Sequence, residues 1–112
     1  MPRRCLTLDL KDDATAIAKY KLYHAKIWPE VRQSLLDAGI TDMEIYLLGT
    51  RLFMIMDVNE GFSLSTKAAA DAANERVQEW EAIMGQFQQP LAQSRPGQRW
   101  VVMERIFSLG EQ

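Results

Sequence analysis

The first part of the chain changes from a period of two to a helical period in its apolar positions. Leucines occupy every second position of residues 5–10, a pattern that predicts a half-buried β-strand. Across residues 12–28 apolar side chains recur every three or four positions, which predicts an amphipathic helix with acidic residues at its positive end. Pro29 has no amide proton and disfavours helical geometry at the residue before it. We therefore expect a break at Trp28 and a second helical segment that ends at Gly39.

Two strands joined by a tight turn are predicted next. Residues 43–48 and 52–58 are rich in apolar side chains, and the short connection at residues 49–51 is typical of an antiparallel hairpin. Residues 52–56 are apolar without alternation. Since alternation marks a strand with one exposed face, this continuous run predicts a strand that is covered on both faces.

The second half of the chain repeats the order of helix and strand. Residues 64–87 have a helical pattern that Asn74 interrupts as a break and N-cap. Residues 88–99 contain two prolines and a glycine and form a predicted loop, whose length points to a functional or intersubunit role. Residues 100–109 mix apolar and charged positions and are predicted to form the last strand.

These elements predict one α+β domain over residues 1–112 with the ferredoxin-like order βαββαβ and a four-stranded antiparallel sheet. Helices of such a domain cover only one face of the sheet. The run at residues 52–56 requires cover on the other face as well. A second copy of the chain, packed sheet against sheet, provides that cover and predicts a homodimer.

The net charge, the apolar stretches and the cysteine count limit which binding partners and which compartment we expect. The 112 residues carry a formal net charge of −2, which leaves no basic surplus for nucleic acid. The apolar stretch near the N-terminus is too short and too alternating for a membrane span or a signal-peptide core, so we expect no membrane partner. Cys5 is the single cysteine and has no partner for an intrachain disulfide, which fits a reducing compartment and predicts a cytoplasmic protein.

The chemistry-bearing residues are few. The sequence has no glycine-rich phosphate loop and no cluster of histidines and cysteines with metal-ligand spacing, so we expect neither cofactor nor metal. His24 is the only histidine and lies four residues after Tyr20 and four before Trp28. That spacing places the three side chains close together around a helix. They can form a polar ligand pocket beside the break, or they can be core residues, and both interpretations stay open.

Residues 20–30, YKLYHAKIWPE, resemble the signature of the L-rhamnose mutarotase family. The resemblance extends over nearly the whole chain, through GITD and IYL at residues 39–47, the Leu-Phe pair of the third strand and the Gln-Glu-Trp of the second helical region. It implies a dimeric α/β barrel built from ferredoxin-like chains and a sugar substrate. It also implies that His24 is the proton donor, that Tyr20 lies in the sugar site and that Trp80 packs on the sugar.

Two positions depart from the family pattern. Met43 stands where the rhamnose enzymes of the family have a tyrosine, and Glu81 stands where they have a second tryptophan. We expect both side chains, together with Trp28 and Trp80, to contact the substrate. These exchanges favour L-fucose over L-rhamnose, unless Glu81 points into solvent.

The leading hypothesis is therefore a mutarotase, an isomerase that interconverts the α and β anomers of L-fucose or L-rhamnose through acid and base catalysis by histidine. An imidazole with a reference pKa of about 6.5 suits both proton transfers. Two alternatives stay open: a small cofactor-independent monooxygenase on the same dimeric barrel, and a non-catalytic dimeric binding module. Two interpretations also remain for the charged strand residues, which either line the pocket or pair with one another: Asp9, Asp57, Glu104 and Arg105.

Overall fold

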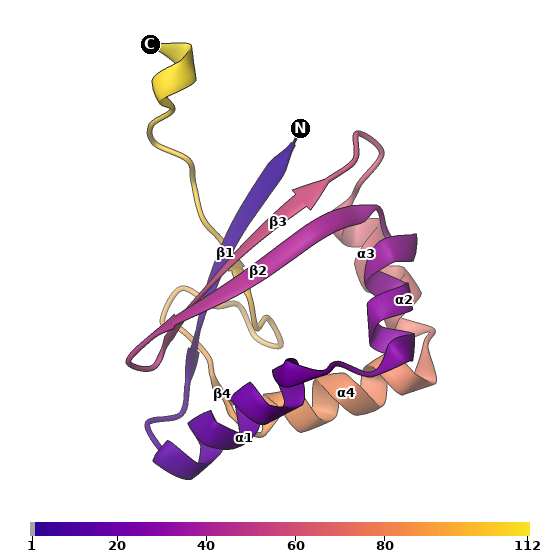
Figure 1. The fold of residues 1–112 in the computed structure, drawn as a ribbon, viewed down its shortest axis with the longest axis vertical. Helices are drawn as coiled ribbons and strands as arrows, with labels where there is room; N and C mark the ends of the chain where they lie inside the picture. The colour runs from indigo at the N-terminus through magenta and orange to yellow at the C-terminus, as the bar shows by residue number, and fades with distance from the viewer. Residues whose placement is uncertain (1) are drawn as a thin grey trace.

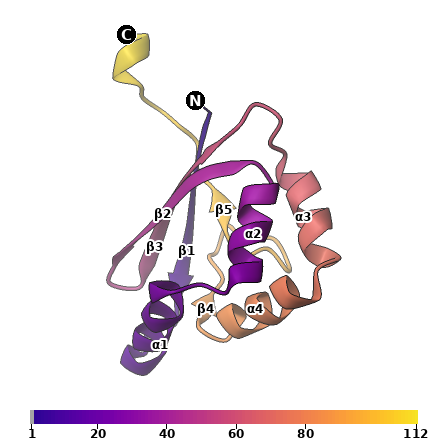
Figure 2. The same ribbon diagram turned by 45° about the vertical axis from the view of Figure 1, so that its right-hand side comes forward.

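A computed structural model describes residues 2–112 and shows an α+β fold with four α-helices packed against one antiparallel sheet (Figures 1 and 2). The sheet order is β2-β3-β1-β4, and β5 also pairs with β1. No helix among residues 2–112 is long and apolar enough to cross a membrane. In chain order the elements are β1 (Arg3–Leu10), α1 (Ala14–Ala25), α2 (Pro29–Asp37), β2 (Ile40–Leu48), β3 (Arg51–Val58), α3 (Leu64–Ala72), α4 (Glu75–Gly85), β4 (Gln88–Gln89), β5 (Val101–Val102) and the 3-10 turn η1 (Leu109–Glu111).

The predicted break between the first two helices is confirmed. Asp13 caps α1 by accepting hydrogen bonds from the backbone amides of the second and third helical residues. Trp28 is the N-cap of α2 and Pro29 is its first residue, where a missing amide proton costs nothing. Gly39 follows α2 with a φ of +95°, a conformation that side chains with a Cβ rarely adopt.

The break in the second helical region is confirmed as well. α3 ends at Ala72, and Asn74 caps α4 by accepting a hydrogen bond of 3.2 Å from the Val77 amide. The predicted hairpin is also present, although β2 begins at Ile40, three residues before the expected start. The short ladder β4 lies in the segment that the sequence predicted to be a loop.

The registers of β1 and β3 divide their side chains between two faces. Leu6 pairs with Met54 and Leu8 with Leu52, and all four side chains are buried beneath the helices. The alternate residues form what we call the outer face, the side of the sheet without helices. Its centre is made by Cys5, Thr7, Tyr46, Phe53 and Ile55. Within the single chain β3 is therefore fully buried on one face only, and its other face is half-buried.

The prediction of a strand over residues 100–109 was wrong. Only Val101–Val102 pairs with β1, opposite Thr7 and Leu6, and the chain then runs away from the sheet past the N-terminus (Figure 1). Continued pairing would place Arg105 opposite Arg3, and like charges directly opposite destabilise a sheet. Glu104 and Arg105 lie outside the sheet.

This early end of pairing changes two further expectations. Met103, an apolar residue of the predicted last strand, is exposed. The free edge of β1 is shared by two short strands, so the sheet has five strands in place of the predicted four.

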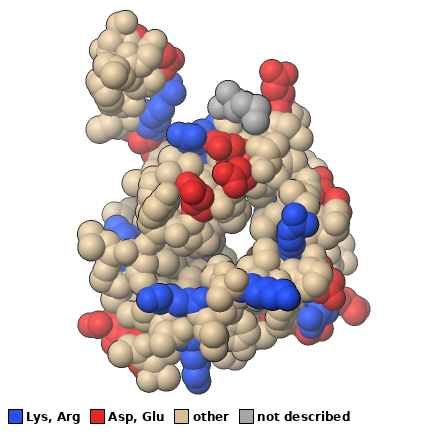
Figure 3. All heavy atoms as spheres, in the orientation of Figure 1, with Lys and Arg blue, Asp and Glu red and all other residues tan. Residues whose placement is uncertain are grey.

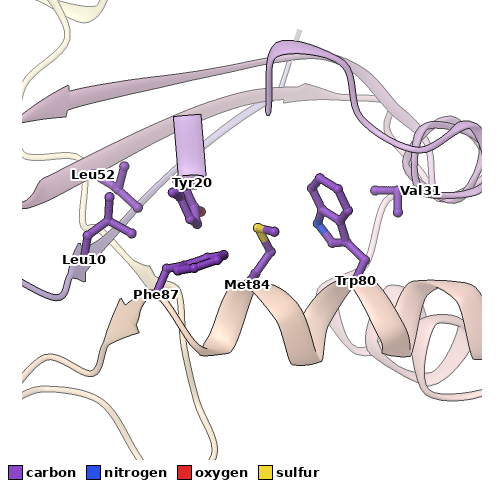
Figure 4. Close-up of a cluster of buried hydrophobic side chains, with 7 residues drawn as sticks. All are labelled: Leu10, Tyr20, Val31, Leu52, Trp80, Met84 and Phe87. Carbon is purple, nitrogen blue, oxygen red and sulfur yellow. The ribbon is translucent and has the colours of Figure 1, made fainter. Parts of the chain in front are cut away.

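The core between the sheet and the helices has two clusters of buried side chains. One joins the sheet to α1, α2 and α4 and is shown in Figure 4, where Phe87 lies below Tyr20 and Trp80 projects from α4 beside Val31. The other packs against the end of α2 and contains Leu6, Ile40, Met54, Met56, Val58 and Phe62. Aromatic residues are concentrated in the first cluster, which is where the candidate site lies.

Candidate active site

A cavity of about 810 Å³ lies between the sheet and the helices, and Figure 3 shows the molecule hollowed in this region. Its walls are mostly apolar side chains from β1, β2, β3 and all four helices. The polar or ionisable side chains that line it are Tyr20, His24, Arg32, Ser34, Thr41, Asp42, Lys67, Glu81, Gln88, Gln98 and Arg99. Among them, Tyr20 contacts both His24 and Gln88, and Arg99 contacts Glu81. A largely apolar pocket with a few convergent polar groups is typical of a small-molecule site.

His24 lies in the last turn of α1, and its imidazole is held by the helix itself. The Nδ1 atom is 2.9 Å from the backbone carbonyl oxygen of Tyr20. A carbonyl oxygen only accepts hydrogen bonds, so Nδ1 carries the proton in the neutral ring and donates it there. Nε2 is then the nitrogen with a free lone pair, and the neutral imidazole presents a base.

Burial sets the charge state of this imidazole. Removal of the ring from water lowers the pKa of His24 from its ordinary value of 6.5, and the hydrogen bond to the Tyr20 carbonyl opposes this shift only in part. Burial disfavours a charged form because the protein interior solvates ions poorly. His24 is therefore mainly neutral near pH 7 and is available to accept a proton.

Tyr20 lies one helical turn before His24 and is almost completely buried. The two rings stack with centroids 4.4 Å apart, as the spacing of four residues predicted. The Tyr20 hydroxyl accepts a hydrogen bond of 3.4 Å from Gln88 Nε2. Burial is the main cause that raises the pKa of Tyr20 above 10.0, so the phenol keeps its proton and can donate it.

Trp80 enters the same site from α4. Its ring makes edge contacts with two other rings: the ring centroids are 5.4 Å apart for His24 and 5.9 Å apart for Tyr23. Trp28 packs against Trp80 at 5.3 Å, and the Arg76 guanidinium lies 3.9 Å above the Trp28 ring centroid. Trp80 lines the cavity, whereas Trp28 is not among the residues that line it. Trp28 thus contacts Trp80 without lining the cavity itself.

The two positions that depart from the family pattern both line the cavity. Met43 contributes an apolar side chain from β2. Glu81 lies one residue after Trp80, and its carboxylate accepts a hydrogen bond of 3.2 Å from Arg99. The Arg99 guanidinium lies 2.8 Å from the position that a Cβ on Gly85 would occupy. A glycine at position 85 therefore leaves room for this arginine against α4.

Sequence reasoning missed Gln88 and Arg99. Both come from the segment that the sequence predicted to be a loop, in which no periodicity indicates which side chains face the helices. The glycine at position 85 was a possible signal, because a glycine inside a helix requires a packing reason. That signal does not identify the side chain that fills the space.

The charged strand residues are placed away from this cavity. Asp9 accepts a hydrogen bond of 2.5 Å from Arg51, and Asp57 accepts one of 2.9 Å from Arg3. Both pairs join β1 to β3 on the outer face of the sheet. Arg105 pairs with Glu111 near the C-terminus. Asp9 and Asp57 therefore form ion pairs, though with arginines rather than with the other residues of the predicted group.

The described part of the chain, residues 2–112, contains no group of three or more His, Cys, Asp or Glu side chains that could hold a metal ion.

Comparisons with known proteins agree on one family. Residues 3–109 match the L-rhamnose mutarotase family. The chain is 48% identical to an L-fucose mutarotase of Xanthomonas campestris over 113 aligned residues, covering 99% of this chain and 90% of that protein. It is 33% identical to a protein of Dictyostelium discoideum, covering 91% of this chain and 85% of that one.

Two solved structures share the fold at low sequence identity. One is an L-rhamnose mutarotase from Formosa agariphila, with a TM-score of 0.69 and 21% identity over 97% of this chain and 99% of that one. The other is tetracenomycin F2 cyclase from Streptomyces glaucescens, a type II polyketide cyclase, with a TM-score of 0.64 and 15% identity over 96% of both chains. The family match and the close relative together show that the chain belongs to the L-rhamnose mutarotase family and is a sugar mutarotase, an isomerase.

Proposed function

We propose that this mutarotase interconverts the α and β anomers of L-fucose and that His24 is the catalytic acid and base. One observation carries the proposal: the hydrogen bond from Nδ1 to the Tyr20 carbonyl leaves Nε2 as the basic nitrogen of His24, a residue that lines the cavity together with Tyr20 and Trp80. The choice of L-fucose is supported by the 48% identity to the mutarotase of Xanthomonas campestris.

The reaction requires only proton transfers at two oxygen atoms. His24 Nε2 takes the proton from the anomeric hydroxyl, the bond between C1 and the ring oxygen breaks, and the ring oxygen receives the proton back from the imidazolium. C1 then rotates in the open aldehyde, and the same steps in reverse close the ring on its other face. Tyr20 stays protonated because burial raises its pKa, so it donates a hydrogen bond to an oxygen that gains charge during ring opening.

The remaining expected site residues bind the sugar in this proposal. Trp80 offers an aromatic surface for the apolar face of the ring, and Trp28 holds Trp80 in place through their contact at 5.3 Å. Met43 packs against the C6 methyl group. Glu81, whose carboxylate is shared with Arg99, accepts a hydrogen bond from a sugar hydroxyl at the mouth of the cavity.

Exchange of anomers at equilibrium tests the proposal directly. Selective saturation of one anomeric proton of L-fucose in an NMR experiment should transfer to the other anomer far faster with the protein than without it. L-rhamnose and D-glucose serve as comparisons, and transfer should be strongest for L-fucose. Equal transfer for all three sugars would contradict the choice of L-fucose. Absence of transfer would favour a binding module, and oxygen consumption with an aromatic substrate would favour a monooxygenase.

The active form in this proposal is a homodimer joined through the outer faces of two sheets. The outer face has an apolar centre, and the pairs Arg3–Asp57 and Arg51–Asp9 border it at the two ends of β1 and β3. The C-terminal segment adds apolar side chains that point away from their own domain, with Ile106 89% and Phe107 64% exposed. Burial of such surface is the usual driving force for association.

The expected location and partners of the protein remain part of the proposal. A cytoplasmic location is supported by the lone and unpaired Cys5. A sugar is the expected small-molecule partner. The net charge of −2 supports the expectation that nucleic acid is not a partner, since binding to phosphates requires a basic surface.

A further inference from the structure

Gln88 is a polar residue in an apolar layer. β4 pairs with the end of β1 so that Gln88 lies opposite Leu10, and directly paired residues of a sheet share one face. That face carries the leucines of β1 and the buried methionines of β3. Gln88 is only 7% exposed there, whereas the next residue, Gln89, lies opposite Asp9 on the other face and is exposed.

One half of the Gln88 amide has a partner and the other half has none. Nε2 donates a hydrogen bond of 3.4 Å to the Tyr20 hydroxyl. Oε1 is buried, and no group within residues 2–112 donates a hydrogen bond to it. A buried acceptor without a donor is unfavourable, and buried polar groups of this kind in native structures call for an explanation. Gln88 lines the same cavity as His24 and Trp80, so a bound molecule can supply the missing donor.

We propose that Gln88 is a specificity-determining residue: its Oε1 accepts a hydrogen bond from one ring hydroxyl of the sugar, while its Nε2 orients the Tyr20 hydroxyl. The phenol oxygen accepts from Gln88, so the phenol proton is directed away from the amide and toward the substrate. The proposal rests on the proposed function and adds which chemical group the site recognises. A sugar that lacks the matching hydroxyl leaves Oε1 unpaired and binds less well.

The test uses L-fucose and its three singly deoxygenated analogues at C2, C3 and C4. Calorimetric titration measures binding of each sugar to the wild-type protein, to Gln88→Met and to Gln89→Met, and NMR saturation transfer measures anomer exchange. Methionine has nearly the same length and no strong hydrogen-bonding group. Gln89→Met makes the same change one residue away on the opposite face of the strand and is the matched control.

The wild-type protein should bind one of the analogues about tenfold more weakly than L-fucose, as expected for one lost hydrogen bond. Gln88→Met should bind L-fucose about tenfold more weakly and should no longer distinguish it from that analogue. Gln89→Met should behave like the wild-type protein. The loss in Gln88→Met should appear without a lower melting temperature, because an unpaired buried acceptor is replaced by an apolar group.

The proposal is overturned if the wild-type protein distinguishes none of the analogues, a result that needs no variant to fold. It is also overturned if Gln88→Met keeps the same discrimination. Sugar binding and exchange without discrimination contradict only the assignment of Gln88. Absence of binding and exchange for every sugar contradicts the proposed function as well, so the two failures are distinguishable.

Discussion

The chemistry of His24 depends on three neighbours. The Tyr20 carbonyl fixes the tautomer, the Tyr20 ring stacks on the imidazole at 4.4 Å, and Trp80 closes one edge at 5.4 Å. The first two contacts follow from helical spacing alone, because residues four apart share a helix face. The third requires α4 to pack against α1.

Replacement of His24 by asparagine removes the proposed base and keeps a similar polar shape. We expect anomer exchange to fall by about 10²–10⁴-fold, the usual contribution of a positioned proton transfer, with an unchanged circular dichroism spectrum. Tyr20→Phe keeps the stacked ring and loses the hydroxyl, so we expect a smaller loss of about tenfold. NMR saturation transfer measures both rates. Near-normal exchange in a folded His24→Asn protein would remove His24 from the mechanism.

The lowered pKa of His24 predicts the pH dependence of the reaction. The base form is neutral, so kcat/KM should be constant above pH 6.5 and should fall as the pH drops through the lowered pKa. The free energy of unfolding depends on pH in the same direction. The unfolded chain binds the proton at a higher pH than the folded protein, so stability is lost as the pH falls below 6.5 toward the lowered pKa of the folded protein. His24 is the only histidine, and a single imidazole resonance therefore reports the titration by NMR. A midpoint above 6.5 would show that burial does not control this group.

At the scale of elements, the breaks between helices position the site. Pro29 begins α2 as a separate helix, so α1 ends shortly after His24 instead of continuing past it. Gly39 then turns the chain from α2 into β2 with a φ of +95°. The Gly39 carbonyl oxygen accepts a hydrogen bond of 2.9 Å from the backbone N–H of Asn59. This bond joins the start of β2 to the end of β3.

Variants of Gly39 at this turn and of Gly49 in the turn between β2 and β3 separate backbone strain from crowding. Gly39→Ala places a Cβ 2.7 Å from the Asn59 side chain in addition to the unfavourable φ, so we expect a loss of more than about 2 kcal/mol in the free energy of unfolding. Gly49→Ala has a φ of +60° and no atom within 4 Å of the new Cβ, and should cost about 1 kcal/mol. Urea denaturation measures both. Equal losses would indicate that Asn59 moves aside freely.

At the scale of the whole molecule, the outer face is the surface that the single chain leaves without cover. The half-buried centre at Phe53 and Ile55 has no helix above it. The exposed C-terminal segment lies beyond the same end of the sheet as the N-terminus (Figure 1). Both features are consistent with the proposed contact between two copies of the chain.

Sedimentation equilibrium tests this contact. The wild-type protein should sediment with twice the chain mass of 12.8 kDa, and Phe53→Asp should shift it toward the monomer, since an unpaired buried charge costs several kcal/mol. Leu22→Asp introduces the same charge at an exposed apolar position of α1 and should leave the dimer intact. A monomeric wild-type protein at micromolar concentration would refute the dimer.

Most helices and strands could be predicted from the sequence, and so could the contact between Tyr20 and His24 within one helix. Apolar periodicity located β1 and the four helices, because each pattern reports which side of a local element is buried. A continuous apolar run located β3. The breaker Pro29 and the cap Asn74 act within a few residues and were therefore predictable from the sequence. For Asp13 the sequence predicted only an acidic residue near the start of the helix, and the structure shows that it is the N-cap. The pairing of Tyr20 with His24 has the same local origin.

Contacts between segments that are distant in the sequence depend on the packing of the whole chain and could not be predicted from local pattern. β1 pairs with both β4 and β5, which are distant from it in the sequence. The short ladder at Gln88 and the early end of β5 depend on this long-range pairing and could not be predicted from local pattern. Arg99 reaches Glu81 across 18 positions of sequence, and Gln88 reaches Tyr20 across 68. Such contacts depend on how helices pack on the sheet, and the cavity that they border exists only in the packed structure.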